Sequence, residues 1–189
     1  CTSLKSVILE GVQHIGPYAF HGCTSLKSIV ILEGVQHIGP YAFESCTSLE
    51  RVVIPRSVNS MFAFAFYGCT SLESIDIPGS VERICEKTFS GCTSLRTVVI
   101  PESVESIVSG AFYRCTSLES IVIPDSVTSI GSWAFLSCSS LRVIVLPDAL
   151  VANRAQYGIT ANQTVISSTD FNKWKQKNNQ YLERKTPDG

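Results

Sequence analysis

The sequence predicts an α/β solenoid in which one short unit is stacked about six and a half times and a helix follows at the C-terminal end. Three observations support this: a cysteine returns at a fixed interval, apolar residues hold fixed positions after it, and the pattern is lost beyond residue 148. Self-similarity with a period of about 20 to 50 residues is typical of repeat architectures. No single unit buries its apolar face alone, so neighbouring units bury it together.

The recurring cysteine sets the period. From Cys23 onward the cysteines are equally spaced, and the first interval is one position shorter than the later ones. The clearest unit is CTSLESIVIPDSVTSIGSWAFLS, from Cys115 to Ser137. The units begin at Cys1, Cys23, Cys46, Cys69, Cys92, Cys115 and Cys138. We therefore assign residues 1–148 to the repeats and residues 149–189 to a C-terminal cap and tail.

The first half of each unit predicts a β-strand. In the sixth unit Ile121 and Ile123 alternate with Ser120 and Val122. Alternation of this kind places the isoleucines inward and the other pair outward. Pro124 then ends the strand, because proline has no N–H to donate to a ladder.

The second half of the unit carries another apolar pair and then a short aromatic segment. Val127 and Ile130 form the pair, and the segment S-W-A-F-L-S follows. We interpret this segment as a single helical turn that carries Phe135 inward. A turn this short has no stability of its own, so packing against neighbouring units must hold it.

Most of the chain matches one motif, C-x-S-L-x-x-I-x-I-P-x-S-V-x-x-I-x-x-x-A-F, with few departures from Cys46 to Pro147. In this motif the chain resembles the BspA-like leucine-rich repeats, a family of host-associated bacteria and some protists. The resemblance extends from the first unit to about position 148. It implies a leucine-rich-repeat solenoid with a parallel sheet on one face and short helical turns on the other. It also implies protein binding or adhesion.

The first unit departs from the others by one residue. It reads KSVILEG where the second unit reads KSIVILEG. A slip of one residue moves every side chain of a strand to the opposite face. We therefore expect this edge strand to be frayed or locally bulged.

The region after Pro147 predicts a strand and a helix. Val165 to Ser167 is a candidate strand, and a helix is expected from about Asp170 to Leu182, with Ser168 or Thr169 as its N-cap. Open solenoid ends need a cover, and we interpret this helix as the cap; a lysine-bearing helix that binds a membrane or a partner is the alternative. The apolar side of the helix carries Phe171, Trp174, Asn178, Tyr181 and Leu182.

The cysteines and histidines do not predict a metal site or a catalytic site. Zinc ligands are usually two to four residues apart, so the cysteine column is interpreted as buried thiols that act as small hydrophobes. Cys85 lies off the column and is expected to be the most reactive thiol. Many unpaired cysteines favour a reducing or anaerobic setting. His14 and His37 are repeat equivalents without a third ligand, so we expect no cofactor and no enzymatic activity.

The outward positions of the sheet are the first candidate partner-binding surface. One outward column is mostly valine and is interrupted by Asp76, and charged side chains flank it. An apolar stripe with a charged rim is typical of interaction surfaces; the alternative is that valine is present only as a strand former. The candidate residues are Arg51, Val53, Asp76, Arg96, Val99, Glu119, Val122, Arg142 and Val145.

A second candidate surface is aromatic. Phe62, Phe64 and Tyr67 lie on the face away from the main sheet, and Trp133 occupies an equivalent place in a later unit. These rings form either a binding surface or local packing between adjacent units.

Charge and hydropathy indicate neither nucleic-acid binding nor a membrane span. The net charge is −1, from 15 basic and 16 acidic residues, which favours neither nucleic acid nor an anionic membrane. No apolar run approaches the roughly 18 residues that a membrane helix needs. The chain begins inside a repeat without a targeting signal, so we expect a fragment of a secreted protein, at the cell surface or delivered into a host cell. We predict a monomeric, non-catalytic module that binds a protein; the alternative is a structural spacer or stalk.

Overall fold

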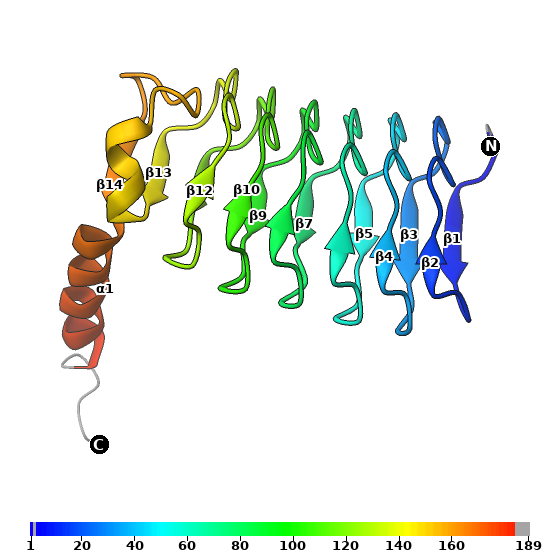
Figure 1. Ribbon diagram of the computed structural model, residues 1–189, viewed down its shortest axis with the longest axis horizontal. Helices are drawn as coiled ribbons and strands as arrows, with labels where there is room; N and C mark the ends of the chain where they lie inside the picture. The colour runs from blue at the N-terminus through cyan, green and yellow to red at the C-terminus, as the bar shows by residue number, and fades with distance from the viewer. Residues whose placement is uncertain (2, 184–189) are drawn as a thin grey trace.

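The coils of the chain stack side by side along one axis, from the N-terminus at one end to a helix at the other (Figure 1). The computed structural model describes the backbone of residues 1 and 3–183 and the side chains up to residue 177. The tail from residue 184 lies outside the described residues. Within them, the predicted solenoid is confirmed.

One strand of each coil belongs to a parallel sheet along one face. Parallel pairs join β1-β3-β5, β7-β9 and β11-β13-β14, and each coil contributes the segment that follows its cysteine. The strands are β1 (Ser6–Leu9), β3 (Ser28–Ile31), β5 (Arg51–Val53), β7 (Ser74–Asp76), β9 (Thr97–Val99), β11 (Ser120–Val122), β13 (Val143–Leu146) and β14 (Thr164–Ser167). The predicted alternation is confirmed, because Ile121 is 3% exposed and Val122 is 47% exposed.

A second parallel sheet, which the sequence pattern did not predict, consists of strands of two residues. They are β2 (His14–Ile15), β4 (His37–Ile38), β6 (Ser60–Met61), β8 (Arg83–Ile84), β10 (Ser106–Ile107) and β12 (Ser129–Ile130). Pairing runs β2-β4-β6 and β8-β10-β12. Two residues are too few for an alternating pattern to be visible in the sequence, and only the neighbouring coils define these strands.

The segment interpreted as a single helical turn is a run of hydrogen-bonded turns instead. The Phe112 N–H donates to the Ala134 carbonyl of the next coil at 2.9 Å, and the Arg114 N–H donates to Leu136 at 2.9 Å. These donors point along the solenoid axis, so they are not available for the i→i−4 bonds of an α-helix. The turn face is therefore a third ladder between coils.

Phenylalanine side chains from the turn face fill the centre of the core. The rings of Phe43, Phe66, Phe89, Phe112 and Phe135 are fully buried. Neighbouring rings stack with centroids 5.1 to 5.7 Å apart. The predicted inward placement of Phe135 is confirmed.

The first coil keeps its register. Ser6 pairs with Ser28 and Leu9 pairs with Ile31, so β1 is neither shifted nor bulged against β3. The residue that the first unit lacks falls in the corner between Leu9 and Gly11, because Leu32 has no counterpart there. The expected strand distortion was wrong, since a corner absorbs the deletion without changing which side chains face inward.

The seventh coil continues across the predicted boundary at residue 148. A 3₁₀ helix, η1 (Asp148–Asn153), replaces the two-residue strand of the earlier coils. The Phe135 N–H then donates to the Tyr157 carbonyl at 2.8 Å, and β14 pairs with β13. Leu150, Tyr157 and Ile159 are buried and cover the last coil of the core.

The predicted C-terminal strand and helix are present as β14 and α1 (Ser168–Glu183). The N-cap differs from the prediction, because Ser167 Oγ accepts a hydrogen bond from the Asp170 N–H at 3.2 Å. Ser168 and Thr169 are instead bound by the Asp148 carboxylate of η1, which accepts from the Thr169 N–H at 3.1 Å. The start of the helix is therefore attached to the last coil.

Beyond its first turn, α1 extends past the edge of the repeats (Figure 1). Phe171 is partly buried, whereas Trp174 is 61% exposed, so the side of the helix predicted to be apolar is not wholly covered. The side chains of Asn178, Tyr181 and Leu182 lie outside the described residues. The role of α1 as a cap stays a prediction.

Candidate interaction surfaces

The sheet face presents an apolar column whose members are aligned by strand pairing. Val30 pairs with Val53, and Asp76 pairs with Val99. The exposed fractions are 56% for Val53, 61% for Val99 and 47% for Val122. Strand pairing thus makes residues that lie one repeat apart in the sequence into neighbours on one surface. We call the outward residues from Val30 to Val122 in this column the valine stripe.

The exposed part of this column is one residue longer at the N-terminal end than predicted, and one residue shorter at the C-terminal end. Ile8 pairs with Val30 and is 69% exposed, so it continues the stripe towards the N-terminus. Val145 pairs with Val122 but is only 3% exposed, because β14 pairs with β13 and α1 packs against it. The expectation that Val145 belongs to an exposed surface was wrong.

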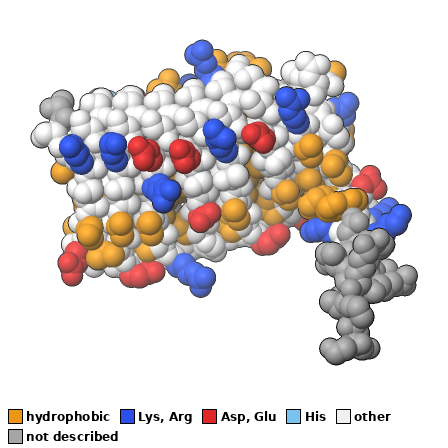
Figure 2. Space-filling model, turned by 180° about the vertical axis from the view of Figure 1, so that it is seen from behind, with side chains coloured by type: hydrophobic (Ala, Val, Ile, Leu, Met, Phe, Trp, Pro, Cys, Tyr) orange, Lys and Arg blue, Asp and Glu red, His pale blue; other side chains and the backbone are white. Residues whose placement is uncertain are grey.

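Charged side chains border the stripe. Arg51, Arg96, Glu119 and Arg142 are exposed, as predicted, and so is Asp76. Figure 2 shows this face, with a row of charged side chains above an apolar row that an acidic side chain interrupts. The rim carries both signs of charge, so it produces no strong net field.

A groove of about 300 Å³ lies in the sheet between β9 and β11. Val99 and Val122 line it, together with Ile100 and Pro124, which lie just after the ends of β9 and β11. The strand pairing of the main sheet is interrupted between β9 and β11, since β9 pairs with β7 and β11 pairs with β13. The groove therefore forms a recess within the stripe.

The second candidate surface contains a longer aromatic stack than the sequence pattern predicts. Tyr18 stacks on Tyr41 with centroids 4.9 Å apart, and Tyr41 stacks on Phe64 at 4.7 Å. The Lys87 ammonium lies 5.4 Å from the Phe64 ring centroid. We call this set the turn column; its members are Tyr18, Tyr41, Phe64, Lys87, Gly110 and Trp133.

All members of the turn column have left-handed backbone conformations, with φ between 48° and 65°. Non-glycine residues seldom adopt this region, and each instance costs of the order of 1–2 kcal/mol. The N–H of each member donates to a carbonyl of the following coil, for example from Phe64 to Glu86 at 2.9 Å. This ladder holds the conformation and aligns the side chains.

The other predicted aromatic residues lie at the border of the turn column. Phe62 is 45% exposed and meets the His37 ring edge-on at 6.3 Å. Tyr67 is 37% exposed and lies 5.8 Å from the Phe64 ring. The rings of Phe62 and Tyr67 thus pack against neighbouring rings and are also exposed to solvent. Tyr18 and Tyr41 were missed, although their recurrence directly before Ala-Phe, one repeat apart, was a visible signal.

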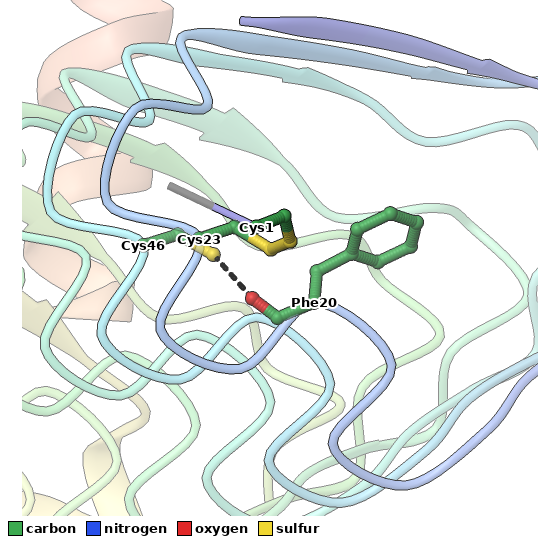
Figure 3. Close-up of a disulfide and its surroundings, with 4 residues drawn as sticks. All are labelled: Cys1, Phe20, Cys23 and Cys46. Atoms are coloured by element: carbon green, nitrogen blue, oxygen red, sulfur yellow. Dashed lines mark hydrogen bonds between the residues drawn. A yellow bond between two sulfur atoms is a disulfide. The ribbon is translucent and has the colours of Figure 1, made fainter. Parts of the chain in front are cut away.

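The cysteine column is buried as expected, except at its N-terminal end. Cys1 and Cys23 form a disulfide with Cα atoms 4.8 Å apart (Figure 3), which corrects the expectation that the whole column is unpaired. The Cys46 thiol donates to the Phe20 carbonyl at 3.0 Å (Figure 3). The same bond recurs at 3.1 to 3.2 Å in the four later coils.

Burial determines the chemistry of these thiols. It raises the pKa of Cys46 to about 11 and that of Cys138 to about 12. Cys85 is only partly buried, and its pKa is raised by burial and lowered by the Arg83 charge. Because a protonated, buried thiol resists oxidation in any compartment, the number of free cysteines gives no argument about location.

The three histidines make contacts with aromatic and acidic neighbours. His14 and His37 stack with ring centroids 4.9 Å apart, and His21 lies 3.3 Å from the Glu44 carboxylate. Across the described part of the chain, no group of three or more histidine, cysteine, aspartate or glutamate side chains could hold a metal ion.

Among the described residues, no helix is both long enough and apolar enough to cross a membrane.

The stacked parallel strands, the cysteine column and the exposed sheet define the chain as a leucine-rich-repeat solenoid. A family model, the BspA type leucine rich repeat region, matches residues 1–86 and 60–177 in 6 copies. The chain belongs to this family. Its members are generally protein-interaction scaffolds without catalytic activity. No curated protein matches the chain.

Two solved structures illustrate the similarity. A leucine rich cell surface protein from Faecalibacterium prausnitzii A2-165 is 40% identical, with a TM-score of 0.70, over 75% of this chain and 38% of that one. The T. pallidum leucine rich repeat protein is 29% identical, with a TM-score of 0.68, over 85% of this chain and 87% of that one. The chain thus spans well under half of the first of these proteins.

Proposed function

We propose that this chain is a non-catalytic module of a bacterial cell-surface protein and that it binds a protein partner through its sheet face as a monomer. The observation that carries the proposal is the valine stripe. Val53, Val99 and Val122 remain exposed in strands whose inward side chains are buried, and a groove of about 300 Å³ separates two of them. Exposed apolar stripes with a polar rim are typical of interaction sites.

The surface location rests on similarity to the 40% identical cell surface protein. Delivery into a host cell is the alternative. The buried thiols do not oppose a surface location, because burial keeps them protonated and unreactive.

A charge-insertion experiment tests the binding face. The variant Val53→Glu/Val99→Glu/Val122→Glu places three carboxylates on the stripe, which should abolish capture because each carboxylate would have to lose its hydration at an interface. The matched control, Phe62→Glu/Tyr67→Glu/Trp133→Glu, adds the same charge to the turn face. Immobilised proteins would be compared for capture from host-cell extract by quantitative mass spectrometry, after circular dichroism confirms that each folds.

Loss of capture by the stripe variant alone supports the proposal. Loss by the turn-face variant alone would move the site to the aromatic surface. Absence of specific capture by the unmodified chain would favour a spacer or stalk over a binding module.

A further inference from the structure

The turn column contains one position without a side chain. Gly110 follows Lys87 and precedes Trp133, so the column has no side chain at this coil, and Tyr113 of the same coil lies beside the gap, with its Cβ 3.8 Å from a Cβ placed on Gly110. A pocket of about 430 Å³ lies at this place and includes Lys87, Tyr113 and Trp133 among its lining residues. The column is therefore continuous from Tyr18 to Lys87 and then open.

The boundaries of this opening are well defined. A Cβ atom placed on Gly110 would lie 3.1 Å from Cγ and 3.7 Å from Cε of Lys87, so the aliphatic stem of Lys87 borders the opening on one side. Trp133 lines it on the other side and is 64% exposed. Its φ of 60° holds this indole on the turn face at a cost in backbone strain.

The opening is one ring thick. Adjacent coils are about 4.8 Å apart, so side chains two coils apart are separated by roughly 9.6 Å. A ring placed midway would have about 4.8 Å on either side once the flexible Lys87 stem, whose Cγ lies 3.1 Å from a Cβ placed on Gly110, turns aside. The protein's own rings in this column stack at 4.7 and 4.9 Å.

We propose that the opening at Gly110 is a binding site for one uncharged aromatic side chain, tyrosine or phenylalanine, of a protein partner. The same chain places tyrosine and phenylalanine at the equivalent positions 18, 41 and 64, where they stack in the same geometry. Glu86 and Lys87 carry opposite charges at the pocket, which does not select for a charged ligand. The site lies on the turn face and is independent of the function proposed for the valine stripe.

Ligand-observed NMR on the full chain tests the site with N-acetyltyrosinamide as the probe and N-acetylleucinamide as its non-aromatic match. We expect saturable binding of the tyrosine compound with a dissociation constant of about 1–10 mM, in keeping with a single small group. The leucine compound should bind at least about fivefold more weakly, because it cannot stack.

Two variants remove the site by different means. Gly110→Tyr fills the opening with the chain's own ring; the other members of the column carry side chains at a similar φ, and the neighbouring Lys87 stem is flexible. Trp133→Ala removes the opposite wall and is decisive if Gly110→Tyr does not fold. Trp174→Ala, on α1, is the control for loss of an exposed indole.

Loss of binding in the site variants, with retention in Trp174→Ala, supports the proposal. Equal binding of the two compounds, or unchanged binding by Trp133→Ala, would overturn it. Binding of a methyl pyranoside in place of N-acetyltyrosinamide would also overturn it and reassign the pocket to carbohydrate.

Discussion

The Cys115 thiol donates a hydrogen bond at 3.2 Å to the carbonyl of Phe89, which lies 26 residues earlier in the chain. Both residues are fully buried, and the thiol is a second donor to this carbonyl, which also accepts a hydrogen bond from the Cys92 N–H at 3.2 Å. Repetition of this contact explains why cysteine, a small hydrophobe with a weak donor, occupies the first position of each unit.

Thiol reactivity should divide the free cysteines sharply. In the native protein an aromatic disulfide reagent should modify about one thiol rapidly, Cys85, whereas denaturant should expose all six free thiols. The rate at Cys85 should rise with pH up to its raised pKa, because the thiolate is the nucleophile. Cys85→Ser should remove the fast phase. Fast labelling that persists in this variant would show that the cysteine column opens.

Truncation of a stacked phenylalanine should be costly. Phe112→Ala should lower the free energy of unfolding by about 3–5 kcal/mol, since it leaves a cavity in the centre of the core. Val53→Ala, on the exposed stripe, should change it by no more than about 0.5 kcal/mol. Urea denaturation followed by circular dichroism measures both. Similar values for the two variants would contradict the inward assignment of the phenylalanine column.

Attachment of α1 should weaken in acid. Hydrogen bonds from Thr169, and then from Ser168, lower the pKa of Asp148 below its ordinary value of 3.8. A lowered folded-state pKa contributes stability that is present above pH 3.8 and is lost as the pH falls through the folded-state value. The amide resonance of Thr169 should therefore shift with a midpoint below 3.8, and Asp148→Asn should abolish this transition.

Asp125→Asn, in the corner after β11, is the control and should leave the Thr169 titration unchanged. A midpoint at or above pH 3.8 would show that the contact between Asp148 and Thr169 is not formed in solution.

A pair of glycines provides a matched test of coil spacing. A Cβ on Gly131 would lie 2.3 Å from the Ser109 backbone nitrogen, so Gly131→Ala should destabilise the protein by about 1–3 kcal/mol through overpacking. Gly79 has no atom within 4 Å of the same construction and no positive φ. Gly79→Ala should therefore stabilise by about 0.4–1 kcal/mol, because it restricts the unfolded chain. Thermal melts of the two variants should shift in opposite directions, and a shared direction would contradict the coil spacing.

Much of the fold was predictable because successive coils share one pattern of apolar residues. The inward Ile121 and Phe135 and the outward Val122 follow from the repeat pattern, and the C-terminal helix follows from the helical spacing of its own apolar residues. The first candidate surface was predictable for the same reason, since strand register turns a constant interval in the sequence into adjacency. What periodicity could not show is where the stripe ends, because burial of Val145 depends on β14 and α1, which lie outside the repeat.

The sequence by itself determined the period, the alternation of each main strand and the placement of the core phenylalanines. The tertiary structure alone decided the second sheet, the turn-face ladder, the attachment of Thr169 to Asp148 and the opening at Gly110. The physical reason is the range of the interactions. Alternating burial depends on residues that are adjacent in the sequence, so a local pattern shows it. Hydrogen bonds between coils join residues that lie about one repeat apart, so no local pattern predicts them.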